Sequence, residues 1–366
     1  MERFRYVSYA QEVIFAPGAL AQVGEEVARR GWRKIMLCAN RSMQSNGTLD
    51  SVKTTLADRL VAVFDRVQPH VQDVQVKEAL AMAGEKNIDA VIGLGGGSPI
   101  GMAKAIGFER LVPIIAIPTT YAGSEMTPVY GVTHTGENPP RKVTVNDAKV
   151  IPQLVLYDPE LTIAMPPALT ASTGINALAH CVEALYSKTR NPLSSAAAGT
   201  GVQHILNALF NCYQDGRNLE WRTEMLLGAH LAGLSLASVP MGLHHGVCHV
   251  LGGTADIPHG IANSIILPHA IRFNADATAT QLLPVAEALG VPVNRINPMV
   301  VMEAMVQKIF HRISQMNLPQ RLRDVGIAES DLPRLAQIAY QNRTVQNNPK
   351  PITDPAQIET VLRDAW

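Results

Sequence analysis

The chain has 366 residues, of which 47% are hydrophobic, so it can bury a core larger than that of a single domain of roughly 100–200 residues. Lys and Arg number 31 together, as do Asp and Glu, and this balance lacks the basic excess that binding to a phosphate backbone needs. No stretch approaches the ~20 apolar residues of a membrane span. The composition predicts a soluble protein of two domains that binds neither nucleic acid nor membrane.

The four cysteines are scattered along the chain and lie mostly within apolar sequence. This spacing predicts buried thiols in a reducing compartment rather than a disulfide framework, and we therefore expect a cytoplasmic protein. The residues are Cys38, Cys181, Cys212 and Cys248.

Short apolar runs rich in β-branched residues alternate with helix-like stretches in the first part of the chain. This alternation predicts βαβ units around a mostly parallel sheet. The expected strands are Lys34–Ala39, Asp89–Leu94, Pro113–Pro118 and Leu154–Tyr157.

The character of the sequence changes after Pro159 to long Ala/Leu/His-containing stretches without strand-like alternation. We expect this second part to be almost entirely helical, with an α/β domain at residues 1–160 and a helical domain at residues 161–366. Prolines are expected to break the helices at Pro192, Pro240, Pro258, Pro268 and Pro319.

A glycine-rich turn directly follows the expected strand Asp89–Leu94. Gly95, Gly96, Gly97 and Ser98 stand between the strand and a helix-compatible stretch, where backbone N–H groups can approach a pyrophosphate at the helix N-terminus. The order of the glycines is not G-x-G-x-x-G, and a purely structural turn is the competing interpretation. The turn predicts a nucleotide-binding edge of the sheet.

A second polar turn follows the next expected strand. Its hydroxyl side chains, Thr119, Thr120 and Ser124, can add donors to the same phosphates. Two such turns at successive strand ends strengthen the prediction of a bound nucleotide.

The helical part contains histidines at helical spacing. Thr173 is expected to cap a helix on which Asn176 and His180 share one face. His245 and His249 have the same spacing further along the chain, and His259 follows Pro258 at the start of another segment. A single such histidine is usually a packed core residue, but this number of imidazoles in one apolar domain indicates a site.

Two chemistries fit these residues. Three imidazoles with a fourth ligand suit a divalent transition metal acting as a Lewis acid, although Asn176 is a neutral amide and a weak ligand. In the alternative, a metal-free pocket, one histidine donates a proton and neighbouring donors hold the developing oxyanion.

Four segments occur in a recognisable order: GLGGGS, PTTYAGSEMTP, GINALAHCVEAL and HHGVCHVLGGTADIPHGIAN. Together they resemble the iron-containing alcohol dehydrogenase superfamily, and most closely its maleylacetate reductase branch. The resemblance implies a Rossmann-like α/β domain followed by an all-helical domain, the dehydroquinate synthase-like fold. It also implies reduction of maleylacetate, or a similar unsaturated oxo dicarboxylate, to 3-oxoadipate in the degradation of aromatic compounds, by a homodimer.

The resemblance also assigns roles to residues. Metal-binding relatives use an aspartate and three histidines, and the matching positions here are Asn176, His180, His245 and His259. The change from aspartate to Asn176 is itself like maleylacetate reductases, so the resemblance implies activity without iron or zinc. The same residues and Tyr121 are then expected to contact the substrate, with His249 as proton donor and with His245 and His180 polarising and orienting the substrate.

The nicotinamide cofactor could be NADH or NADPH. In many relatives an aspartate pairs with the adenosine ribose, and the resemblance matches its position to Asn40, which would not repel a 2′-phosphate. A solvated turn at residues 40–42 is the competing interpretation. Further candidates for phosphate or carboxylate contacts are Arg141, Lys142 and Lys149, for which a solvated basic loop is the competing and commoner explanation.

Two alternative functions remain open at this point. One is a metal-dependent NAD(P) alcohol dehydrogenase or aldehyde reductase. The other is a nucleotide-binding sensor without turnover, which the histidine set disfavours because simple nucleotide binding does not require it.

Overall fold

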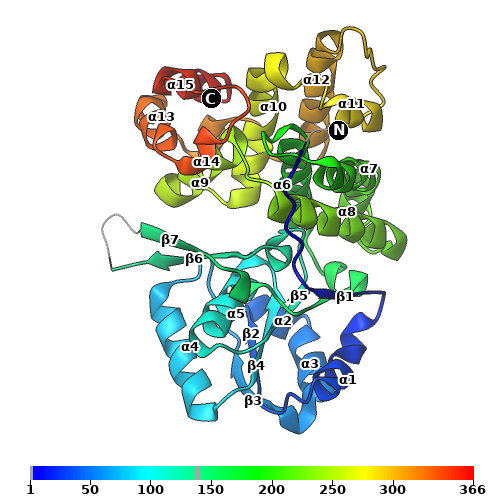
Figure 1. Cartoon of the computed structure of the whole chain (residues 1–366), viewed down its shortest axis with the longest axis vertical. Helices are drawn as coiled ribbons and strands as arrows, with labels where there is room; N and C mark the ends of the chain where they lie inside the picture. The colour runs from blue at the N-terminus through cyan, green and yellow to red at the C-terminus, as the bar shows by residue number, and fades with distance from the viewer. Residues whose placement is uncertain (1–2, 137–140) are drawn as a thin grey trace. The chain divides into compact units, whose positions relative to one another are not determined.

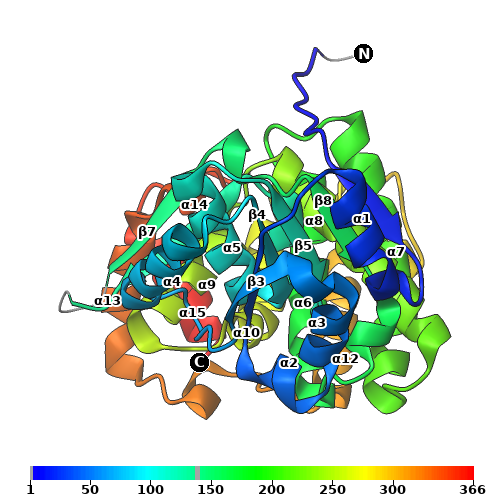
Figure 2. The same ribbon diagram turned by 90° about the horizontal axis from the view of Figure 1, so that it is seen from below.

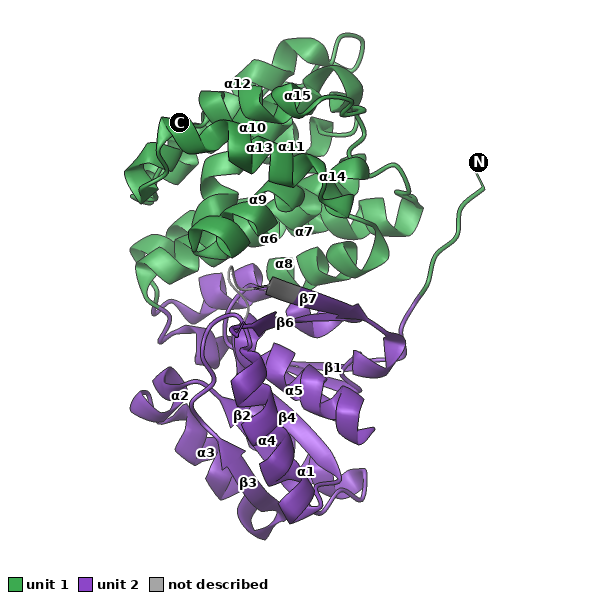
Figure 3. Cartoon of the chain, turned by 90° about the vertical axis from the view of Figure 1, so that its left-hand side faces the viewer, with its two compact units in different colours: residues 1–7, 166–216, 227–366 green, residues 8–165, 217–226 purple. Residues whose placement is uncertain are grey.

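The computed structural model describes residues 3–136 and 141–366, except for the side chains of Arg141 and Lys142. The chain divides into two compact units, coloured separately in Figure 3. The α/β unit contains Ser8–Met165 together with Arg217–Leu226, and the helical unit contains the other described residues. The domain boundary expected between residues 160 and 161 stays a prediction.

A six-stranded parallel sheet forms the centre of the α/β unit (Figure 1). The strand order is β1-β8-β5-β4-β2-β3. Numbered along the chain from β2, the five strands other than β1 have the order 2-1-3-4-5 that is known from doubly wound sheets, with the topological switch point between β2 and β4. The strands are β1 Glu12–Phe15, β2 Ile35–Ala39, β3 Leu60–Phe64, β4 Ala90–Gly95, β5 Ile114–Pro118 and β8 Leu154–Tyr157.

Helices cover both faces of this sheet (Figures 1 and 2). In β2, Ile35 and Leu37 face a core shared with α1 and α3, whereas Met36 and Cys38 face a core shared with α4 and α5. Strands buried on both faces need continuous apolar runs, which explains why they are easily recognised in the sequence. The helices are α1 Val23–Arg29, α2 Arg41–Ser45, α3 Thr48–Leu56, α4 Asp73–Lys86 and α5 Gly97–Arg110.

All four expected strands are present, but four further strands were not predicted. Strands β1 and β3 lie at the two edges of the sheet, where burial on only one side gives a weaker apolar signal. An antiparallel pair, β6 Val129–His134 and β7 Arg141–Asn146, forms a separate two-stranded sheet.

The helical unit is built from long helices, as expected. Helix α6 packs on α7 and α10, while α9 packs on α10, α13 and α14. The buried core cluster around Leu243, Leu251 and Ile266 joins α9 and α10 to the C-terminal helices. The helices are α6 Pro167–Tyr186, α7 Pro192–Gln214, α8 Leu219–Ser238, α9 Leu243–Ala255, α10 His259–Thr278, α11 Leu283–Ala288, α12 Met299–Gln315, α13 Leu332–Tyr340, α14 Arg343–Gln346 and α15 Pro355–Asp364. The first part of α8, up to Leu226, belongs to the α/β unit.

Two local predictions in this unit are wrong. Thr173 does not cap a helix, because α6 already begins at Pro167 and the Thr173 hydroxyl donates to the Leu169 carbonyl oxygen one turn earlier. Pro268 does not break a helix but lies inside α10. Proline fixes the start of α6, since its lack of an N–H costs nothing in the first turn.

Among the described helices, no single one is long and apolar enough to cross a membrane. Helices α8 and α9 pass such a test of length and composition only as a pair, and they meet at a bend of 98°.

Candidate active site

The residues expected to hold the nucleotide lie at the carboxyl ends of three neighbouring strands. Asn40 follows β2, Gly95 ends β4, and Thr119 follows β5. In an open parallel sheet this edge, at the switch point between β2 and β4, is where ligands bind. The Thr119 N–H donates to the Gly95 carbonyl oxygen at 3.0 Å, which ties the two turns together.

The glycines of the first turn are required by close approach and by backbone conformation. Gly95 has a φ of 137°, and a Cβ there would lie 2.9 Å from Pro99 Cγ and 3.3 Å from Asn40 Oδ1. A Cβ on Gly96 would lie 3.2 Å from Thr120 Oγ1. Asn40, Gly96 and Thr120 therefore surround one small region at the N-terminus of α5, where Gly97 and Ser98 form the first turn.

Lys104 supports the second polar turn from inside the unit, a role that the sequence did not suggest. Its ammonium group is fully buried and donates to the carbonyl oxygens of Ser124, Thr127 and Val129 at 2.5, 2.6 and 3.0 Å. Burial lowers the pKa of Lys104 to about 7, and the nearby Glu125 carboxyl acts in the opposite direction. Lys104 thus fixes the turn that follows Thr119 and Thr120.

The other expected residues of this unit lie in different surroundings. Tyr121 is fully buried, and its hydroxyl accepts a hydrogen bond from Arg222 Nη1 at 3.0 Å, so a contact with substrate stays a prediction. Lys149 is exposed beside Asp147. The side chains of Arg141 and Lys142 lie outside the described residues.

The structure brings the predicted histidines of the helical unit together. The rings of His180 and His245 stack with centroids 4.5 Å apart, and His249 and His259 stack at 5.7 Å. His245 links the two pairs, with its centroid 6.3 Å from His249 and 5.9 Å from His259. Helices α6, α9 and α10 therefore bring four imidazoles together, and their function as a site stays a prediction.

This histidine cluster has a buried half and an exposed half. His180 and His245 are buried, with only 3% and 2% of their surface exposed, whereas His249 and His259 lie at the surface. Burial, and then the neighbouring histidines, hold the pKa of both His180 and His245 well below the usual value. The buried pair is therefore neutral at pH 7, and the exposed pair can exchange protons with water.

Asn176 lies one turn before His180 on α6 and is 4% exposed. Four buried atoms in this region have no hydrogen-bond partner in the described part of the chain: Asn176 Oδ1, His180 Nδ1, His245 Nε2 and Asn263 Oδ1. Buried polar atoms are nearly always paired, so such orphaned atoms indicate a place for a ligand or for water.

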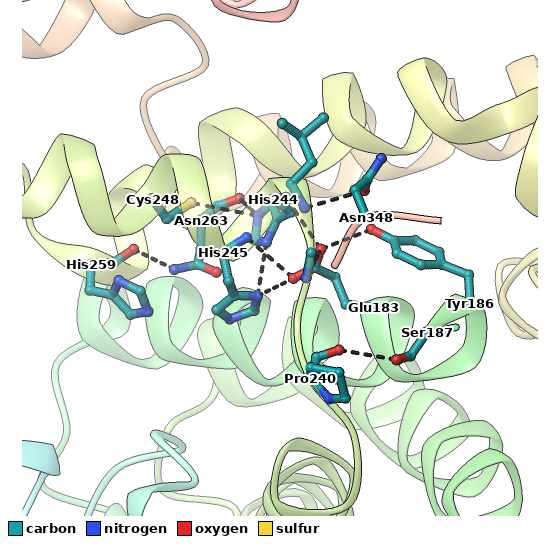
Figure 4. Close-up of polar contacts among 12 residues, drawn as sticks. Glu183, Tyr186, Ser187, Pro240, His244, His245, Cys248, His259, Asn263 and Asn348 are labelled. Atoms are coloured by element: carbon teal, nitrogen blue, oxygen red, sulfur yellow. Dashed lines mark hydrogen bonds and ion pairs between the residues drawn. The ribbon is translucent and has the colours of Figure 1, made fainter. Parts of the chain in front are cut away.

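Glu183 was not predicted, although it follows His180 by three residues on the same helix. Its buried carboxylate accepts hydrogen bonds from the backbone N–H groups of Gly242, His244 and His245, and from the Tyr186 hydroxyl. It also lies 2.7 Å from His245 Nδ1 (Figure 4). Glu183 therefore caps the N-terminus of α9 and holds one of the catalytic candidates.

The remaining N–H group of this helix end belongs to Leu243 and donates to Asn348 Oδ1 at 3.2 Å. Gly242 makes the double cap possible, since a Cβ there would lie 3.1 Å from both Asn348 Oδ1 and Glu183 Oε1.

A divalent metal ion needs several ligand atoms close enough together to bind one ion. In the described part of the chain, one group of His, Cys, Asp or Glu side chains has ligand atoms that all lie within 4.8 Å of one another, namely Glu183, His244 and His245. These atoms are engaged in hydrogen bonds with each other and with the backbone. The expected set of Asn176, His180, His245 and His259 contains no anion, and its histidines do not form such a group. The residues therefore fit a resident iron or zinc ion poorly.

Comparison with known proteins shows the class of protein that this fold and site define. Residues 10–159 match the family model described as "Iron-containing alcohol dehydrogenase", and residues 170–366 match "Fe-containing alcohol dehydrogenase family, C-terminal". The chain belongs to the iron-containing alcohol dehydrogenase family, and it is an oxidoreductase. The fold class and the family expected from the sequence are confirmed.

Within this family, the chain is similar to maleylacetate reductases over its whole length. The chain is 35% identical to the maleylacetate reductase of Burkholderia cepacia, over 100% of this chain and 98% of the relative. It superimposes on the crystal structure of maleylacetate reductase from Agrobacterium tumefaciens with a TM-score of 0.90 and 32% identity, covering 100% and 99% of the two chains. It is also similar to a structure of 1,3-propanediol oxidoreductase, with a TM-score of 0.94, 30% identity and full coverage of both chains.

Proposed function

We propose that this enzyme reduces maleylacetate, or a similar unsaturated oxo dicarboxylate, to the saturated 3-oxoadipate type of product in the breakdown of aromatic compounds. The single observation that carries the proposal is the buried, uncharged Asn176 one helical turn before the buried His180, in a chain that is similar to maleylacetate reductases over its whole length. A carboxylate at residue 176 would repel a substrate with two negative charges, whereas an amide does not.

The reaction can be assigned to groups of this chain. NADH or NADPH, when bound, supplies the hydride that reduces the carbon–carbon double bond, and the strand ends around Asn40, Gly96 and Thr120 would hold its phosphates and ribose. Addition at the carbon β to the ketone leaves negative charge on the ketone oxygen, and the adjacent carbon must then gain a proton. We assign this proton to His249, which is exposed and one helical turn from His245.

We assign the buried histidines, His180 and His245, a role in binding the substrate. Neutral His180 and His245 can orient the substrate, and His259 can contact it from the start of α10. A neutral imidazole can stabilise the oxyanion only with an N–H directed at the ketone oxygen. We assign this contact to the exposed His249 and His259 in preference to the buried His180 and His245.

The experiment is a spectrophotometric measurement of reduced-cofactor consumption by the purified protein. Maleylacetate is compared with simple aldehydes, each with NADH and with NADPH, before and after treatment with a chelator. We expect turnover of maleylacetate, none of the aldehydes, and activity that survives chelation. Metal analysis of the same sample is expected to give substoichiometric iron and zinc.

A second candidate function, a metal-dependent alcohol dehydrogenase or aldehyde reductase, is favoured by one observation. The bond between His245 Nδ1 and Glu183 leaves the other ring nitrogen facing the cluster, as in many metal-bound histidines. Activity that disappears with the chelator and returns with one metal would establish this candidate and overturn the first. The variant Asn176→Asp provides a matched comparison, because it should raise metal affinity and lower maleylacetate turnover.

We also propose that the enzyme acts as a homodimer in the cytoplasm. The buried thiols of all four cysteines support a reducing compartment. Measurement of molar mass in solution tests the dimer.

A further inference from the structure

Hydrogen-bond partners around the histidine cluster determine which ring nitrogens carry protons. His244 Nε2 lies 3.1 Å from the carbonyl oxygen of Asn263, and a carbonyl oxygen can only accept. Neutral His244 therefore carries its proton on Nε2 and presents a lone pair on Nδ1. That lone pair faces His245 Nδ1 at 3.2 Å.

Hydrogen-bond partners also determine the tautomer of His245. Its Nδ1 lies between two acceptors, the His244 lone pair and the Glu183 carboxylate oxygen Oε2 at 2.7 Å. A proton on Nδ1 satisfies both contacts. The other nitrogen, Nε2, is buried without a hydrogen-bond partner among the described residues and then carries a lone pair.

Donors surround both oxygens of Glu183. Oε1 accepts from the backbone N–H groups of Gly242 and His244 and from the Tyr186 hydroxyl, and Oε2 accepts from the backbone N–H of His245 (Figure 4). These contacts use the oxygens as acceptors, so Oε2 also presents an acceptor to His245 Nδ1.

We propose that Glu183 is a positioning residue that fixes His245 as the Nδ1–H tautomer, so that His245 accepts a hydrogen bond at the site instead of donating one. This changes the role expected from the sequence, in which His245 polarises the substrate as a donor. Electrophilic assistance then comes from His249 or His259, and His245 Nε2 orients a group that carries a proton, such as a water molecule or an imidazole N–H of those histidines.

The catalytic part of this inference rests on the proposed function, because it assumes that the histidine cluster is the reaction site. The tautomer itself does not depend on any activity. The two parts can therefore fail separately.

The central test is ¹⁵N NMR of protein labelled at histidine, in which long-range couplings between ring protons and nitrogens distinguish the two tautomers. The His245 signals are assigned with a His245→Gln variant. In the wild type we expect a protonated Nδ1 and an unprotonated Nε2 on His245. A proton on Nε2 would mean that the shared proton sits on Glu183, and this result would overturn the proposal.

The variant Glu183→Gln tests the cause. With its oxygen at the position of Oε1, the amide keeps the bonds from Gly242 and His244, and its NH₂ group then faces His245 Nδ1 as a donor. We expect the His245 proton to move to Nε2, and turnover to fall by about 10–100-fold, the range known from hydrogen-bond partners of metal-ligating histidines. Cofactor affinity should stay unchanged. A folded Glu183→Gln protein that retains the Nδ1–H tautomer would refute the mechanism.

Tyr186→Phe is the matched control, because it removes one donor to Glu183 Oε1 but leaves the contact of Oε2 with His245 intact. The His245 tautomer should be unchanged in this variant, with a smaller loss of turnover. Equal losses in the two variants would indicate a purely structural role for Glu183. If Glu183→Gln does not fold, the His245 tautomer measured in the wild type tests the proposal by itself. Failure to reduce maleylacetate, with the expected tautomer present, would remove the proposed function but leave the tautomer assignment standing.

Discussion

The contact between α10 and α6 determines where His259 lies, and Gly260 is the residue that makes this contact possible. A Cβ on Gly260 would lie 2.9 Å from the backbone carbonyl carbon and oxygen of Ser172. Ordinary contacts between such atoms are about 3.5–4.0 Å. The variant Gly260→Ala therefore requires the start of α10 to move away from α6 by roughly 0.6–1 Å.

Two measurable effects follow from this movement. Overpacking of this kind costs about 1–3 kcal/mol, and each kcal/mol lowers the melting temperature by about 2–4 °C in a protein of 150–250 residues. A displacement near 1 Å at a reacting group can also reduce turnover on the order of 10²-fold. We expect both effects because His259 directly precedes the substituted residue.

The assays are thermal unfolding followed by circular dichroism, and turnover at saturating cofactor. Gly253→Ala is the matched control, since a Cβ there meets no heavy atom within 4 Å and the residue lies in helix α9. Alanine in a helix is more stable than glycine by up to about 1 kcal/mol, so the control should melt no earlier than the wild type. Wild-type melting and turnover in Gly260→Ala would refute the reasoning, as would equal losses in both variants.

Three further predictions concern the glycine-rich turn, the histidine cluster and His269, a buried residue of α10 whose ring packs against Phe310. Gly96→Val should weaken cofactor binding while the fold survives, because its side chain would lie against Thr120 where the pyrophosphate is expected; unchanged affinity by calorimetry would contradict this placement. His249→Asn should bind cofactor normally but lose about 10²–10⁴-fold in turnover, whereas lowered thermal stability with full turnover in the folded fraction would indicate a structural residue. Burial lowers the pKa of His269 to about 4, so its contribution to stability is complete above pH 6.5 and is lost as the pH falls towards 4. In His269→Phe the free energy of unfolding should therefore vary less with pH over this range. Parallel pH curves for the variant and the wild type would contradict the prediction.

The sequence allowed the fold class to be predicted, and the histidines to be proposed as a site, because both depend on local patterns. Strands buried on two faces are continuous apolar runs, and the spacing of His245 and His249 is that of one helical turn. The edge strands β1 and β3 carry less apolar signal and were not predicted.

The residues that were missed act through contacts distant in sequence. Glu183 reaches the N-terminus of α9, and its bond with Gly242 spans 59 residues. Lys104 holds carbonyl oxygens 20 to 25 residues further along the chain. Such long-range contacts leave no periodic pattern in the sequence. A carboxylate or ammonium group within an otherwise apolar helix is nevertheless a signal that could have identified both residues.

The cap of α9 has a consequence for the order of events during synthesis of the protein. Leu243 bonds to Asn348, which follows it by 105 residues, so the helix that carries His245 and His249 cannot acquire its complete cap until the ribosome has translated well past residue 348. Contacts of such long sequence separation form late because the loop must close first. The nascent helical unit should therefore stay sensitive to protease around residues 242–245 until the segment containing Asn348 has emerged.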